Sequence, residues 1–243
     1  MIGHELNLHS VYEKYYFDEF GYIRNVAAPV QLDDEMLKSI QYKMLKEAKS
    51  ICFVGDSITE GTKNGGVPWY EPMESFIGGR VENVSIGGAT TKTLLRQEFL
   101  NKIISTEAEL YVIAIGTNDV RYRNGAICAM TEEYVKNLSV LRHGIVSKKT
   151  DSKFIFVAPW TSTGGDKISK LRYSNKIGMN KKYSDALRAF CENNRDIYID
   201  PNVAINSHFD LEPHSKYLVD WIHPNAVAGV KLYSECFWSG KNL

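Results

Sequence analysis

The feature that most constrains the fold of this chain is the alternation of short apolar runs with longer amphipathic segments. The runs are rich in Val, Ile, Phe and Tyr and end near Gly, Pro, Asp or Asn, as buried strands do. They cover residues 50–54, 80–86, 109–116, 153–159 and 196–201. Helix-like segments separate or follow them, at residues 68–78, 92–105, 131–148, 179–193 and 225–238. This order predicts an α/β fold with a flavodoxin-like, doubly wound parallel sheet of five strands.

The first 49 residues stand apart from this alternation. They hold an aromatic cluster within residues 12–22, and then a helix-like segment at residues 33–48. No Gly/Ser-rich linker follows, and a chain of 243 residues suits one large domain. We therefore predict an N-terminal extension, residues 1–49, packed on a main domain of residues 50–243. The alternative is an arm that binds a partner or a second copy of the chain.

Composition excludes several classes of function. The chain has 29 basic and 29 acidic residues, so it lacks the basic excess of a dedicated nucleic-acid-binding protein. No stretch approaches the ~20 apolar residues that cross a bilayer, and the N-terminal segment lacks the signal-peptide pattern. The four cysteines form no CxxC pair, and we expect them to be reduced. These features predict a cytoplasmic protein without nucleic-acid or membrane partners, and they leave its oligomeric state open.

The first predicted strand of the main domain runs into the sequence GDSITEG, residues 55–61. The spacing of its glycines fits neither a P-loop nor a dinucleotide-binding turn, and Thr59 stands where a hydrolase elbow G-x-S-x-G needs glycine. What remains is Ser57, a serine in a tight turn at the carboxyl end of a strand, where parallel sheets place their ligands. We therefore take Ser57 as the candidate nucleophile.

A serine nucleophile needs a base, and the sequence DWIHP near the other end of the chain offers one. Asp220 and His223 are three residues apart, so in a loop or helical turn the carboxylate can reach the imidazole. Asp220 would then hold one ring nitrogen and leave the other free to accept the Ser57 proton.

The next two strand ends carry groups suited to a developing anion. Gly87 and Gly88 allow a close approach of the backbone to a ligand, and Asn118 in GTND supplies a neutral amide donor. Taken singly, each sequence is more typical of an ordinary turn. Their position at the same sheet edge as Ser57 favours a catalytic interpretation.

The sequence resembles the SGNH hydrolases, also called the GDSL esterase/lipase family. Four blocks that mark this family occur in order within residues 50–240, namely GDSITEG, NVSIGGAT, GTND and DWIHP. One small departure is Ile58, where the motif that names the family has Leu. Residues 1–49 match no block, so the resemblance says nothing of their role.

The resemblance implies a three-layer α/β/α fold and ester hydrolysis without a metal or other cofactor. It implies that Ser57, His223 and Asp220 are catalytic, and that His223 takes the proton of Ser57 as the serine attacks an ester carbonyl. It further implies an oxyanion hole made by the main-chain N–H groups of Ser57 and Gly88 and by the side chain of Asn118. An acyl-enzyme would form, and water would release the acid.

Candidate substrate contacts come from side chains close in sequence to the strand ends. We predict that substrate is bound by Asp56, Trp160 and Trp221. The aromatic faces of the two tryptophans suit sugar rings, although tryptophans also fill cores. The basic segment 166–182 is either a solvated face or a loop that favours an anionic substrate such as an acidic saccharide. The expected partner is a small-molecule ester or an acetylated saccharide.

The favoured function is therefore hydrolysis of small acyl esters, most simply an O-acetyl group on a carbohydrate. One alternative is an O-acyltransferase, in which a sugar hydroxyl replaces water at the same site. Another is a non-catalytic carbohydrate-binding or assembly protein, against which the nucleophile and base argue.

Overall fold

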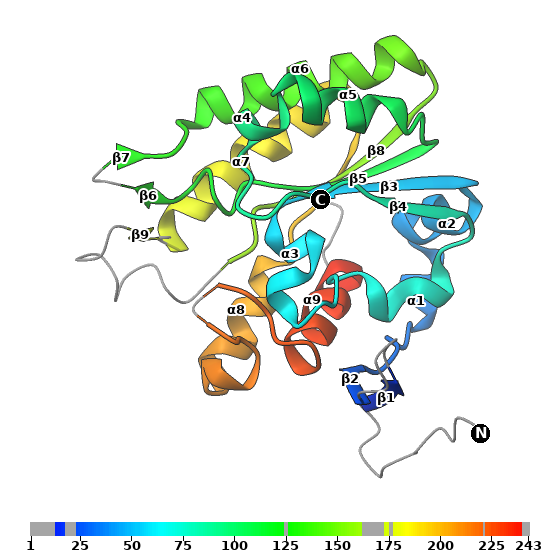
Figure 1. The fold of residues 1–243 in the computed structure, drawn as a ribbon, viewed down its shortest axis with the longest axis vertical. Helices are drawn as coiled ribbons and strands as arrows, with labels where there is room; N and C mark the ends of the chain where they lie inside the picture. Colours follow the sequence, from blue (N-terminus) through cyan, green and yellow to red (C-terminus); the bar gives the residue numbers. More distant parts are fainter. Residues whose placement is uncertain are drawn as a thin grey trace.

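The computed structural model describes residues 13–17, 23–123, 126–161, 173–174, 177–220 and 222–239. Its centre is a sheet of five strands, all parallel, in the order β10-β8-β5-β3-β4 (Figure 1). The strands are β3 (Ser50–Gly55), β4 (Arg80–Asn83), β5 (Leu110–Ala114), β8 (Lys153–Val157) and β10 (Ile197–Ile199). The predicted doubly wound parallel sheet is confirmed. Each strand lies within its predicted run or, for β3, ends one residue beyond it.

Helices cover both faces of this sheet, which gives three layers (Figure 1). One face carries α4 (Thr91–Leu94), α5 (Gln97–Ser105), α6 (Thr131–Lys148) and α7 (Ile177–Asn194). The other carries α1 (Asp34–Lys38), α2 (Ile40–Glu47), α3 (Ser57–Glu60), α8 (Asn202–Leu211) and α9 (Ala228–Ser239).

The strand residues divide between two hydrophobic cores, one on each face. Alternate side chains of a strand point to opposite faces, so Phe53 and Val112 enter one core while Cys52 and Tyr111 enter the other. All four of these residues are essentially inaccessible to solvent. Strands buried on both faces explain why the sequence shows continuous apolar runs rather than alternation.

The direction in which the chain adds strands reverses at β3. After β3 the chain forms β4 on one side, and it then returns to the other side for β5, β8 and β10. Such a reversal opens a crevice beyond the carboxyl ends of the two strands that flank it. The segments after β3 and β5 therefore line the place where a ligand is expected.

Two smaller sheets lie outside this central one. Strands β1 (Glu13–Phe17) and β2 (Ile23–Ala27) form an antiparallel pair near the N-terminus. Their continuation contacts the main body, where the Ala27 N–H donates to the Ala226 carbonyl at 3.1 Å and the Val30 N–H to that of Pro72 at 2.9 Å. Strands β6 (Tyr122–Arg123), β7 (Ala126–Ile127) and β9 (Tyr173–Ser174) form the other sheet.

Several helices differ from those predicted. The segment 33–48 is divided at Ser39, whose hydroxyl caps α2, and the segment 92–105 is divided near Arg96, which has an extended backbone. Residues 68–78 contain a 3₁₀-helix, η2 (Glu71–Phe76), with Pro72 in its first turn. Helix α8 was not predicted at all.

All four cysteines are free thiols, three of them buried. Among the residues that the structure describes, no helix has the length and apolar character needed to cross a bilayer. Within the same residues, no three or more His, Cys, Asp or Glu side chains gather as a metal site would require.

Candidate active site

Ser57 is the first residue of α3 and directly follows the turn that ends β3. Gly55 allows this turn, because a Cβ atom there would lie 2.5 Å from the Ala114 carbonyl oxygen of the neighbouring strand. Asp56 caps α3, and its Oδ1 accepts the Ile58 N–H at 3.0 Å. The chain thus turns sharply from strand to helix at a serine that keeps 8% of its surface exposed.

His223 lies against this serine although it is distant in sequence. The Ser57 Oγ is 2.8 Å from His223 Nε2, and His223 Nδ1 is 2.7 Å from Asp220 Oδ2. An ionised carboxylate only accepts hydrogen bonds, so Nδ1 carries the ring proton and Nε2 is the acceptor for the Ser57 hydroxyl. The structure therefore brings together Ser57, His223 and Asp220 in the order that proton transfer from serine requires.

The Asp220 carboxyl is held in its ionised form. Its partial burial opposes ionisation, but hydrogen bonds from the His223 ring and from the main-chain N–H groups of His223 and Ile222 outweigh it. The pKa of Asp220 falls from 3.8 to about 2. At neutral pH this residue is therefore a permanent anion beside the imidazole.

The loop that carries Asp220 and His223 is closed on itself. Leu218 and Pro224 form an isolated β-bridge, and the Val219 N–H donates to the His223 carbonyl at 3.0 Å. Asn225 clamps the base of the loop, since its Nδ2 donates to the Lys216 carbonyl at 2.7 Å. Asn225 thus helps to position the loop that carries the acid and the base.

Gly88 and Asn118 lie at the ends of the two strands that flank β3. Gly88 has a φ of +73°, which favours glycine. Within the described residues, neither the Gly88 N–H nor the Ser57 N–H donates a hydrogen bond. The Asn118 amide donates one N–H to the Ala89 carbonyl at 3.0 Å, which leaves its second N–H available. These three groups have the donor capacity that an oxyanion hole requires.

A buried network that the sequence analysis missed joins these two strand ends. Asp119 accepts the Thr91 hydroxyl at 2.6 Å and the Thr91 N–H at 3.1 Å. The Thr91 hydroxyl in turn accepts from Asn137 of α6 at 3.0 Å. Asp119 was visible as the last residue of GTND, but nothing in the sequence indicated its partners.

Asp56 is placed beside the nucleophile and not on a surface that a substrate can reach. Only 1% of it is exposed, so the expectation that it binds substrate is wrong. Burial is the largest influence on its pKa and raises it from 3.8 to about 6, against the opposing effects of the Ile58 N–H and of Arg121. Asp56 shapes the turn that presents Ser57.

Trp160 also belongs to the protein interior. It is completely buried, stacks on Tyr233 at a ring distance of 4.7 Å and meets the edge of Trp69. No face of its ring is open to a sugar, so this candidate substrate contact is wrong as well. Trp221 lies outside the described residues, as does most of the basic segment 166–182.

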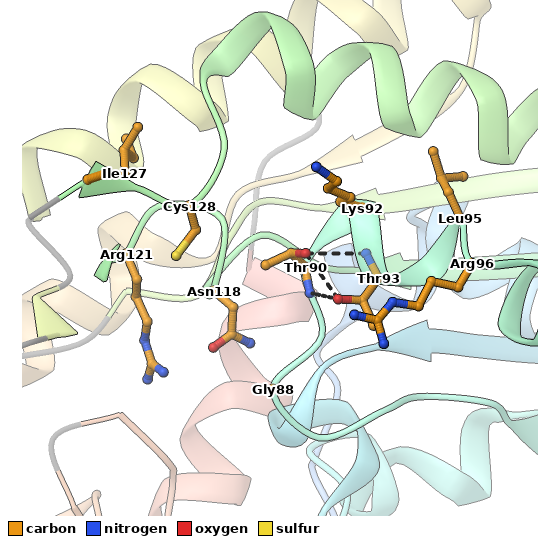
Figure 2. A pocket seen from close by; sticks show the side chains of 11 residues that line it. Gly88, Thr90, Lys92, Thr93, Leu95, Arg96, Asn118, Arg121, Ile127 and Cys128 are labelled. Carbon is orange, nitrogen blue, oxygen red and sulfur yellow. Dashed lines mark hydrogen bonds between the residues drawn. The ribbon is translucent and has the colours of Figure 1, made fainter. Parts of the chain in front are cut away.

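A pocket of about 650 Å³ opens beside Gly88 and Asn118 (Figure 2). It extends from these two residues to α4 on one side and to β7 on the other. Its lining includes the side chains of Lys92, Arg96 and Arg121, none of which was predicted as a site residue. Lys92 and Arg96 lie in and just after α4, whereas Arg121 follows β5, so only the folded chain brings them together.

Comparison with known protein families shows which family the chain belongs to. The model of the GDSL-like Lipase/Acylhydrolase family matches residues 53–228, which is well over half of the chain. The chain belongs to this family. As a GDSL-like acylhydrolase it is an ester hydrolase, as the resemblance implied. The family match spans all four sequence blocks, from Ser57 to His223.

Solved structures agree with this fold for the GDSL-like domain. A protein described as a GDSL-like lipase from Parabacteroides merdae superposes with a TM-score of 0.64 at 19% identity, covering 80% of this chain and 96% of the other. A catalytic mutant of Axe2, an acetylxylan esterase from Geobacillus stearothermophilus, gives 0.58 at 21%, covering 79% and 93%. LAE5, an alpha/beta hydrolase enzyme from the Lake Arreo metagenome, gives 0.58 at 20%, covering 79% and 94%. The comparison with curated protein sequences finds no match.

Proposed function

We propose that this esterase hydrolyses small acyl esters, with an O-acetyl group on a carbohydrate as the favoured substrate, through an acyl-enzyme on Ser57. The observation that carries the proposal is the continuous hydrogen-bonded relay from Ser57 Oγ to His223 Nε2 and from His223 Nδ1 to Asp220. A relay of this kind activates a serine that is otherwise a poor nucleophile.

In the proposed reaction, His223 accepts the Ser57 proton as Oγ attacks the ester carbonyl. The resulting oxyanion accepts hydrogen bonds from the N–H groups of Ser57 and Gly88 and from the free N–H of Asn118. His223 then protonates the leaving alcohol, and the acyl group remains on Ser57. A water molecule, deprotonated by His223, releases the acid and restores the serine.

The preference for an acetyl group on a carbohydrate is supported by similarity. Axe2, which shares the fold, is described as an acetylxylan esterase and as an acetyl-xylooligosaccharide esterase. We therefore place acetylated oligosaccharides ahead of long-chain lipids as substrates.

The experiment is hydrolysis of 4-nitrophenyl esters of increasing acyl length, and then of acetylated xylooligosaccharides, by three proteins. These are the native chain, Ser57→Ala and the control Ser147→Ala, which loses only an exposed hydroxyl on α6. We expect the native chain and the control to release acetate fastest and Ser57→Ala to be silent. Equal turnover by Ser57→Ala would refute the serine mechanism.

Two further outcomes separate the alternatives. Transfer of the acetyl group to an added sugar in place of water would identify an acyltransferase. Sugar binding without turnover, together with failure of a fluorophosphonate to label Ser57, would identify a binding protein.

A further inference from the structure

The pocket beside Gly88 and Asn118 is larger than an acetyl group needs. Its volume of about 650 Å³ lies within the roughly 300–1,000 Å³ that small-molecule sites occupy. A two-carbon acyl group fills only a small part of such a space. The pocket therefore has room for a second group of the substrate, attached close to the ester carbonyl that the oxyanion donors would hold.

The lining of this pocket is cationic. Lys92, Arg96 and Arg121 all line it, and none of the described residues that line it is an aspartate or glutamate. Two of the three have acidic partners, because Glu133 is 4.0 Å from Lys92 and Asp56 interacts electrostatically with Arg121. Arg96 forms no ion pair with a described residue. The positive charge of Arg96 is thus available to a ligand in the pocket.

The two arginines approach this space from different sides. In Figure 2 the side chain of Arg121 points the same way as that of Asn118, and Arg96 extends in from the end of α4 toward Thr93. The apolar side chains of Leu95 and Ile127 also line the pocket. Apolar walls reduce the local dielectric constant and strengthen the attraction between a cation and an anion.

We propose that this pocket binds an anionic group of the substrate, so that the enzyme prefers esters that carry a carboxylate, sulfate or phosphate a few atoms from the scissile carbonyl. This inference rests on the proposed function of the same site and names its substrate class. The planar guanidinium of Arg96 offers paired N–H donors that match the paired oxygens of such a group. The anionic group belongs either to the acyl part or to the alcohol part of the ester.

The test uses pairs of substrates that differ only in charge. For the acyl side these are monomethyl succinate and methyl succinamate, assayed by methanol release. For the alcohol side they are acetoxyacetate and acetoxyacetamide, assayed by acetate release. We expect kcat/KM for the carboxylate to exceed that for the amide by about tenfold in one of the two pairs, the size of one charged hydrogen bond. The pair that responds identifies which side of the ester carries the charge.

Variants of Arg96 connect the preference to the pocket. Arg96→Gln is expected to lower the carboxylate-to-amide ratio by about tenfold, and Arg96→Glu to reverse the preference. Arg80→Gln is the matched control, because Arg80 is exposed at the amino end of β4, on the opposite edge of the sheet. Raised salt should also reduce the native ratio, since it screens charges that are open to solvent.

Equal rates for carboxylate and amide in both pairs, or a ratio that Arg96→Gln leaves unchanged, would overturn the proposal while the esterase function stands. If no ester is cleaved at all, the proposed function fails, but the pocket is still tested by equilibrium binding of monomethyl succinate to the unaltered chain. Binding that exceeds that of methyl succinamate and is lost in Arg96→Glu supports the anionic pocket. Equal binding of the two compounds refutes it.

Discussion

Asp119 accepts hydrogen bonds from both the hydroxyl and the main-chain N–H of Thr91, at 2.6 Å and 3.1 Å. Asp119 follows β5, and Thr91 begins α4 just after Gly88, so this contact ties together the two segments that hold Gly88 and Asn118. All groups in the contact are buried. Buried networks of this kind are costly to leave half satisfied. The geometry of the expected oxyanion donors therefore depends on a pair of residues that need not touch substrate.

Replacing Thr91 by Val should disturb both stability and catalysis. The variant keeps the shape of the side chain but leaves Asp119 without its shortest donor and Asn137 without its acceptor. We expect a loss of about 1–3 kcal/mol in the free energy of unfolding, measured in urea, together with a lower kcat. The control Ser105→Ala loses only an exposed hydrogen bond and should change neither. Unaltered kcat in Thr91→Val would show that the network does not position the donors.

The buried Asp56 should make stability fall as pH rises. Its pKa is about 6 in the folded protein against 3.8 for an unperturbed aspartate, so folding favours the protonated form. Its contribution to stability is therefore fully present below pH 4 and is lost as pH rises through 6. Asp56→Asn does not titrate. Its free energy of unfolding relative to the native chain should rise between pH 4 and 7, by at most about 3 kcal/mol. A difference that is flat over this range would contradict burial of the carboxyl in its native setting.

Asp220 should show the opposite dependence. Its pKa is lowered to about 2, so its stabilising effect is present above pH 3.8 and is lost as pH falls toward 2. Asp220→Asn should be less stable than the native chain at pH 6, with the gap closing near pH 3 in denaturant titrations. Its kcat should fall by roughly 10²–10⁴, because the amide no longer fixes the imidazole tautomer. A gap that widens on acidification would rule out the charged pairing with His223.

The Trp160→Ala variant distinguishes a role of Trp160 in the core from a role in binding sugar. Because Trp160 is completely buried against Tyr233 and Trp69, we expect the free energy of unfolding to fall by about 3–5 kcal/mol. The KM for an acetylated sugar, measured where the variant is folded, should change no more than that for a 4-nitrophenyl ester. The stability control is Val203→Ala, because the Val203 side chain is exposed on α8. A selective rise in KM for the sugar would restore the substrate-contact hypothesis.

The sequence predicted the central sheet well because its strands are buried on both faces, and such strands leave continuous apolar runs. It predicted less well where a single polar residue interrupts a helix. Ser39 divides one helix because its hydroxyl caps the next, and this contact depends on the local backbone. Helix α8 was missed, although five of its ten residues are apolar.

The same contrast holds for the site. Ser57, Gly88, Asn118, Asp220 and His223 lie in recognisable blocks, so the candidate residues could be named from sequence. Trp160 could not be assigned, because an aromatic residue near a strand end looks alike whether it faces substrate or the core. The cationic pocket could not be predicted either, since Arg96 and Arg121 line the same pocket only when α4 packs beside the segment after β5.

The bridged loop between Leu218 and Pro224 carries the acid and the base of the candidate catalytic centre. Asp220 and His223 lie on this loop and Ser57 follows the central sheet, so the hydrogen bond of 2.8 Å between Ser57 Oγ and His223 Nε2 joins the base to the nucleophile. A small outward shift of the loop would disengage the nucleophile while the carboxylate and imidazole stayed paired. Active and inactive forms of such a centre would then differ by one hydrogen bond, and the Asp220 carboxylate would keep its His223 partner in both.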